Sequence, residues 1–258
     1  MRSEVTSPST AFISHSDCGR HDTGWNHPEH VGRLRAIPRA LRNDFELYGA
    51  VQHLEGRHAT PDEIALAHEP SYVALVESIA AKGGGRLDAD TVESEGSWAA
   101  GTAGAGCVLD AVDLALSGAA IRSFSAVRPP GHHALRASGM GFCLFGNVAI
   151  AAHYARQTKR LDRVLIVDWD VHHGNGTQDI FYEDNSVFFF STHQWPWYPG
   201  TGPAGETGDG AGKGTTMNRP FPAGSGREQI VTAFREDLRR AADAFKPDLV
   251  LISAGFDS

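Results

Sequence analysis

The stretch Arg163-Val-Leu-Ile-Val-Asp-Trp-Asp-Val-His-His-Gly-Asn-Gly176 decides the fold. Its first half is a continuous aliphatic run, which is typical of a strand buried on both faces of a parallel sheet. Three ionisable side chains follow within five positions, at Asp168, Asp170 and His172. In open α/β sheets, ligands bind beyond the carboxyl ends of the strands. The stretch therefore predicts a parallel sheet with a binding site at this strand end.

The rest of the chain alternates strand and helix patterns. Apolar runs predict further strands at 123–127, 187–191 and 248–253. Helical spacing predicts helices at 33–48, 61–64, 71–81, 98–116, 147–160, 178–182 and 227–244, and Gly-, Pro- or Asp-rich composition predicts loops at 13–29, 87–96 and 195–215. This alternation favours an α/β fold with a central parallel sheet flanked by helices on both faces.

We predict one domain over residues 1–258, with a polar lead-in at 1–9. The chain stops at Ser258, directly after a predicted strand, and a terminal strand without a covering helix is unusual in this architecture. We therefore expect the C-terminal part of the domain to be missing from this sequence.

Composition excludes several classes of protein. The formal net charge is −8 at pH 7, and no run of Lys and Arg is present, so we expect no direct nucleic-acid binding. No apolar stretch approaches the roughly 20 residues of a membrane span, so we expect no membrane association. The three cysteines, Cys18, Cys107 and Cys143, are too few and odd in number for a disulfide framework, which favours a reducing, cytoplasmic location. Homo-oligomer formation is left open.

A second strand pattern ends in the same way as the first. The segment Asp248–Asp257 reads Asp-Leu-Val-Leu-Ile-Ser-Ala-Gly-Phe-Asp. If the two strands are near neighbours, Asp257 lies beside Asp170 and His172. Two carboxylates and an imidazole with an open position are the ligand set of a catalytic zinc. The alternatives are that Asp257 caps a following helix and that the first cluster is a solvated turn.

Two further segments carry candidate chemistry. His132 and His133 follow a strand and the stiff Arg-Pro-Pro-Gly turn, so one or both can act as general base on a metal-bound water. The alternative is an ordinary surface pair of histidines. Phe142 and Tyr198 stand on Gly- and Pro-rich loops and could line a narrow apolar entrance, although such aromatic residues are often ordinary packing.

Taken together, these motifs resemble the histone deacetylase superfamily, in particular class II-like bacterial members, on the arginase/deacetylase fold. The matching segments are His27-Pro-Glu29, Arg128-Pro-Pro-Gly-His-His133, Gly141-Phe-Cys143, Asp168-x-Asp-x-His-His-Gly-Asn-Gly-Thr-Gln178, Tyr198-Pro-Gly-Thr-Gly202 and Gly255-Phe-Asp257. They run across nearly the whole chain in the family's order.

The resemblance implies a role for each matching residue. Asp170, His172 and Asp257 would bind one catalytic Zn²⁺. His132 and His133 would be the catalytic pair, with Asp168 behind the first histidine and Asn175 behind the second. The carboxylate and the amide would push the two proton affinities apart, leaving His133 as the better general acid and base. Gly141, Phe142, Tyr198 and Asp90 would bind substrate, Arg33 would line an inner channel, and Asp168, Asp170, His172, Ser191 and Thr192 would hold a structural K⁺.

The implied activity is zinc-dependent hydrolysis of acyl groups from lysine side chains or related acylated amines. An acetylpolyamine amidohydrolase is an alternative within the same family. The family's oxyanion donor is a Tyr in a Gly-Gly-Tyr motif beyond the third ligand, and this sequence ends one residue after Asp257. A non-catalytic, truncated protein that binds metal or acetyl-lysine is therefore a second alternative. A binuclear manganese site is disfavoured, because Gly174 stands where arginases place an additional Asp.

Overall fold

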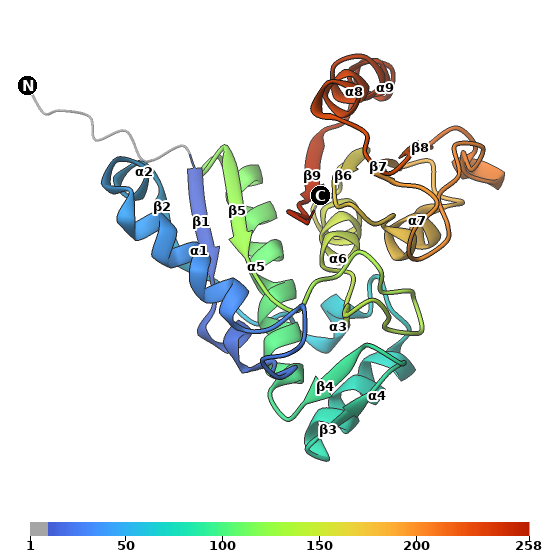
Figure 1. Ribbon diagram of the computed structural model, residues 1–258. Helices are drawn as coiled ribbons and strands as arrows, with labels where there is room; N and C mark the ends of the chain where they lie inside the picture. Colours follow the sequence, from blue (N-terminus) through green and yellow to red (C-terminus); the bar gives the residue numbers. More distant parts are fainter. Residues whose placement is uncertain (1–9, 258) are drawn as a thin grey trace, which may run out of the picture. The chain divides into compact units, whose positions relative to one another are not determined.

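The computed structural model describes residues 10–257 (Figure 1). The predicted lead-in at 1–9 lies outside the described residues. The described chain forms two compact units, one up to Pro130 and one from Gly131. The expectation of a single domain stays a prediction.

The first unit is built on a three-stranded parallel sheet. Strand β1 (Thr10–Ser14) lies between β2 (Gln52–Glu55) and β5 (Arg122–Ala126). Strand β5 confirms the prediction to within one residue, whereas β1 and β2 were not predicted. Both are short, and β2 alternates half-buried and exposed residues, so neither carries a long apolar run.

Six helical segments complete the described part of this unit. They are η1 (Ser16–Arg20), α1 (Gly32–Asn43), α2 (Phe45–Ala50), α3 (Pro61–Ile64), α4 (Pro70–Ala81) and α5 (Ser97–Ser117). Helices α3, α4 and α5 confirm their predictions, whereas η1 lies within the predicted 13–29 loop. The predicted single helix over 33–48 is wrong, because it breaks at Asp44. The backbone of Asp44 is extended, and its carboxylate accepts the Leu47 N–H at 2.9 Å as an N-cap that starts a new helix.

Helix α5 is the core helix of the first unit. It is long and apolar enough to pass as a membrane span by length and composition, which the sequence analysis did not anticipate. Most of its N-terminal half is buried, and Cys107 packs with Ala11 and Ile13 of β1. This burial is typical of a core helix. The predicted loop over 87–96 is wrong in part, since β4 (Val92–Ser94) pairs antiparallel with β3 (Gly84–Arg86).

The second unit contains a four-stranded parallel sheet in the order β8-β7-β6-β9. Its strands are β6 (Val164–Asp168), β7 (Val187–Gln194), β8 (Thr216–Phe221) and β9 (Leu249–Ser253). Strands β6 and β9 are neighbours, with Asp168 opposite Ser253, which meets the condition under which Asp257 was expected beside Asp170. Strand β8 was not predicted. Although its sequence is a continuous apolar run, β9 is only half-buried, because Val250 and Ile252 are each 50% exposed.

Helices pack on this sheet through an aromatic-rich core. They are α6 (Asn147–His153), continued by a π-helical turn (Tyr154–Thr158), α7 (Asn175–Phe181), and α8 (Arg227–Thr232), which runs through a π-helical segment (Ala233–Leu238) into α9 (Arg239–Phe245). Leu165 and Phe190 pack against Ala241 and its neighbours. Because successive strand residues alternate, the equally buried Ile166 and Phe189 face the other side of the sheet. Apart from a short turn at Gly210–Gly212, the predicted 195–215 loop is confirmed.

Candidate active site

Three candidate metal ligands meet at the carboxyl ends of β6 and β9. Asp170 and His172 follow β6, Asp257 follows β9, and one donor atom from each lies within 4.8 Å of the others. The Nδ1 atom of His172 is 3.0 Å from an Asp170 oxygen and 3.1 Å from an Asp257 oxygen. Backbone N–H groups of His172 and Val171 donate to the same two carboxylates and fix their orientation.

The electrostatics of this cluster favour a bound cation. Hydrogen bonds from His172 to the carboxylates of Asp170 and Asp257 raise the pKa of His172 to about 9. Burial acts to raise the pKa of Asp257, but its bonds to His172 and the Val171 amide outweigh burial and lower it to about 2. Two carboxylates thus converge on one imidazole nitrogen. Two oxygen donors and one nitrogen donor fit Zn²⁺, which accepts both carboxylate and imidazole ligands.

A buried histidine–aspartate pair lies beside this cluster. His132 Nδ1 is 2.9 Å from the Oδ2 of Asp168, and both side chains are buried. Burial acts to lower the pKa of His132, but the Asp168 carboxylate outweighs it and the net shift is upward. Gly174 makes this arrangement possible, because a Cβ at that position would collide with the Asp168 carboxylate.

The second histidine of the pair has the opposite electrostatic environment. His133 Nδ1–H donates to Asn175 Oδ1 at 2.7 Å, which leaves the lone pair on Nε2. Burial and the neighbouring His132 lower the pKa of His133 to about 2, so its ring is neutral. The two rings lie 4.0 Å apart between centroids. Adjacent imidazoles with pKa values pushed apart are typical of acid–base sites.

Aromatic and glycine residues surround His133 on one side. The Tyr198 ring meets the His133 ring edge-on at 5.2 Å between centroids and is 39% exposed. Gly141 has a positive φ of 55°, and a Cβ there would collide with the His133 ring. Phe142 follows directly, also with a positive φ, 68°, which is rare for an aromatic residue. These residues form a narrow wall next to a neutral imidazole.

The sequence analysis missed His173, which organises the long loop. His173 is buried and bonds to Thr201 at 2.8 Å and to Gln178 at 2.9 Å. Burial, the largest influence, lowers the pKa of His173 to about 3. Because Thr201 lies three residues after Tyr198, this bond fixes the segment that carries the tyrosine. The sequence signal that could have pointed to His173 is its position directly after His172 in the motif.

The proposed K⁺ ligands lie on neighbouring strands. Asp168 and Ser191 are opposite each other in the β6–β7 register, and Thr192 follows on β7. The Ser191 hydroxyl bonds to His193 Nδ1 at 2.9 Å. Their role in binding a monovalent cation stays a prediction.

The remaining two candidates lie in the first unit. Arg33 is 4.0 Å from Glu29, and its side chain is 53% exposed. Asp90 accepts the Thr91 hydroxyl at 3.2 Å, and its pKa is raised by burial and by neighbouring Asp88. Their roles toward substrate and product stay predictions.

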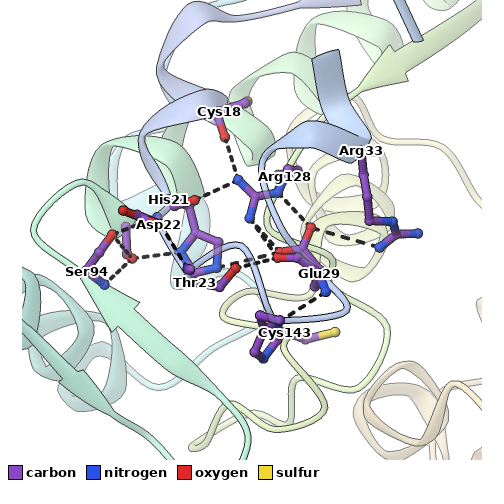
Figure 2. A network of polar contacts seen from close by, with 12 residues as sticks. Cys18, His21, Asp22, Thr23, Glu29, Arg33, Ser94, Arg128 and Cys143 are labelled. Atoms are coloured by element: carbon purple, nitrogen blue, oxygen red, sulfur yellow. Dashed lines mark hydrogen bonds and ion pairs between the residues drawn. The ribbon is translucent and has the colours of Figure 1, made fainter. Parts of the chain in front are cut away.

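Nothing in the sequence indicated a buried ion pair between Arg128 and Glu29, the residue that Arg33 approaches. Figure 2 shows Arg128 reaching Glu29 with two bonds, of 2.6 and 2.7 Å, and donating to the carbonyl of His21 at 2.7 Å. Both charged side chains are buried, so each depends on the other to offset its desolvation. The bidentate pair joins the loop before α1 to the segment after β5.

Known proteins are similar in sequence to this chain over most of its length. The sequence model of the histone deacetylase domain matches residues 27–258. The chain belongs to the histone deacetylase family. It is 43% identical to histone deacetylase 10, chloroplastic, from Oryza sativa subsp. japonica, over 90% of this chain and 56% of that protein. It is 38% identical to a probable deacetylase of Archaeoglobus fulgidus, over 96% of this chain and 69% of that protein.

A solved structure gives the same result for the fold. The HDA15 HD domain superposes with a TM-score of 0.93 at 38% identity, covering 98% of this chain and 73% of that one. The fold is therefore the predicted α/β arginase/deacetylase fold. The chain spans little more than half the length of the plant relative with which it shares 43% identity.

Proposed function

We propose that this chain is a zinc-dependent deacylase that hydrolyses acyl groups from lysine side chains or related acylated amines. One observation carries the proposal: Asp170, His172 and Asp257 converge beside two histidines whose pKa values are pushed apart. The donor set fits Zn²⁺, which when bound would polarise an amide carbonyl and acidify a water molecule. Membership of the histone deacetylase family supports the same reaction class.

The protein's own residues divide the proton transfers between them. His133 is neutral with its lone pair on Nε2, so it can take the proton of the attacking water and return it to the leaving amine. His132, held by Asp168, stays a hydrogen-bond donor and keeps positive charge close to the developing oxyanion. Tyr198 and Phe142 would hold the apolar stem of an acyl-lysine beside His133.

Two further elements belong to the proposal. Asp168 and Ser191, paired across β6 and β7, would help to hold a structural K⁺ near the first histidine. A cytoplasmic location is supported by the cysteines, all three of which are free and buried in the described chain.

Turnover of an acetyl-lysine peptide by the full chain, prepared with saturating Zn²⁺, tests the proposal. We expect His133→Ala to lower kcat about 10²- to 10⁴-fold, the usual contribution of a positioned acid–base group. The matched control is His53→Ala, because His53 is exposed and lies on β2. Faster turnover of an acetylated polyamine would favour the polyamine alternative. Zinc binding without turnover of either substrate would refute the proposal in favour of a non-catalytic binder.

A further inference from the structure

A second cluster of metal-ligating side chains lies in the first unit, apart in sequence from the residues discussed above. His15 directly follows β1, Asp17 lies in η1, and His58 lies in the loop between β2 and α3. One donor atom from each lies within 4.8 Å of the others. His58 Nε2 is 3.1 Å from Asp17 Oδ2, and the His15 and His58 rings meet edge-on at 4.5 Å between centroids.

We propose that His15, Asp17 and His58 form a second metal site, which binds a divalent transition ion of the Zn²⁺ type. Two imidazole nitrogens suit Zn²⁺, which also accepts a carboxylate oxygen, whereas Mg²⁺ and Ca²⁺ prefer all-oxygen ligand sets. His58 is exposed and the other two are half-buried, so water can complete a four-coordinate shell. The site needs no residue of the proposed catalytic centre.

A hydrogen bond on the side of the His58 ring that faces away from Asp17 fixes the orientation of this ring. The Thr102 hydroxyl donates to the carbonyls of Trp98 and Ala99, at 3.0 and 3.1 Å, within its own helix. It therefore accepts at its oxygen the Nδ1–H of His58, at 2.8 Å. A neutral His58 ring then carries its lone pair on Nε2, the atom that faces Asp17. Outer contacts of this kind fix the tautomer of metal-binding histidines and tune their affinity.

His15 gives the proposal a specific signature. Its Nδ1 accepts the backbone N–H of Asp17 at 3.0 Å. A neutral imidazole has one lone pair, so a metal-bound His15 must give up this hydrogen bond, either by binding through Nδ1 or by becoming protonated there. Binding of metal should therefore move the Asp17 amide resonance, which an ion pair between His58 and Asp17 alone would leave in place.

The site would clamp two chain segments. Asp17 and His15 belong to the turn after β1, whereas His58 belongs to the loop that enters α3, about 40 residues later. Beyond the end of the β1–β2 pairing, the His58–Asp17 ion pair and the contact between the His15 and His58 rings already join these segments, and a shared metal ion would tie them more firmly. Because metal that binds only the folded state stabilises it, zinc should raise the melting temperature through this site.

The test is Zn²⁺ titration of the full chain, followed by calorimetry and by metal content after dialysis. We expect two equivalents for the unchanged chain and for His53→Gln, a matched exposed histidine on β2. We expect one equivalent for His58→Gln, and a 10- to 100-fold weaker second site for Thr102→Val, which keeps volume and removes the hydroxyl. Asp257→Asn should retain the equivalent that His58→Gln loses.

Two outcomes would overturn the inference. One is a His58→Gln chain that binds as much zinc, as tightly, as the unchanged chain. The other is an Asp17 amide resonance that does not respond to zinc, which would leave an ordinary His58–Asp17 ion pair. If the unchanged chain binds only one equivalent of zinc and Asp257→Asn does not reduce it, the proposed catalytic site fails while this second site is still supported.

Discussion

Glu93→Gln should stabilise the chain at alkaline pH and leave it unchanged at acidic pH. Glu93 lies on β4, its side chain is 3% exposed, and neither carboxylate oxygen has a hydrogen-bond partner. Burial raises the pKa of this carboxyl from 4.5 to about 8. The folded state therefore keeps the proton between these two pH values, whereas the unfolded state loses it. Stability from the neutral form is present below pH 4.5 and is lost as pH rises through 8.

The size of the effect follows from that difference. The difference between the two pKa values corresponds to a loss of about 5 kcal/mol in the free energy of unfolding at high pH, an upper figure because a buried carboxylate can draw in water. Between pH 6 and pH 9, the free energy of unfolding should fall by about 3 kcal/mol more for the unchanged chain than for Glu93→Gln. Urea denaturation followed by tryptophan fluorescence measures it, with the exposed neighbour Glu95→Gln as the matched control. Parallel curves of stability against pH for the unchanged chain and Glu93→Gln would refute the reasoning.

Three further predictions concern the buried Arg128–Glu29 ion pair, the close contact of Gly174 with Asp168, and the Tyr198 ring beside His133. Arg128→Met should cost about 3–5 kcal/mol of stability, because it leaves the Glu29 carboxylate buried without a partner, and adding Glu29→Gln should recover most of it in urea denaturation. Gly174→Ala should lower turnover at least 10-fold without unfolding the chain, since the new methyl displaces Asp168; unchanged kinetics would contradict this contact. Tyr198→Ala should raise KM more than it lowers kcat, whereas Tyr198→Phe, which keeps the ring, should resemble the unchanged chain in steady-state assays.

Local pattern was sufficient to predict the centre of the second unit. The apolar run before Asp168 and the similar run before Ser253 predicted two parallel strands, and the structure pairs them. Because parallel strands end at the same edge of a sheet, the side chains that follow them had to meet there. Local pattern alone placed Asp257 beside Asp170 only on condition that the two strands are neighbours; the structure supplies that condition, and their binding of zinc stays a prediction.

Elements with weak local signals were not predicted correctly. Strands β1, β2 and β8 are only four to six residues long, and their pairing partners stabilise them. The break at Asp44 was missed because the apolar spacing continues across it, whereas the extended backbone of Asp44 and its cap bond to Leu47 show that a new helix begins. Apolar periodicity extends over only a few residues, so it cannot reveal the pairing with distant strands that stabilises β1, β2 and β8.

The sequence by itself determined the fold family, the strand that carries the candidate site and the residue types gathered at its end. Only the tertiary structure decided that Glu93 is buried without a partner and that His15 meets His58. The physical reason is that burial and contact between residues about 40 positions apart depend on how helices and strands pack. A local pattern specifies which face of an element is apolar, whereas packing selects the neighbours that this face meets.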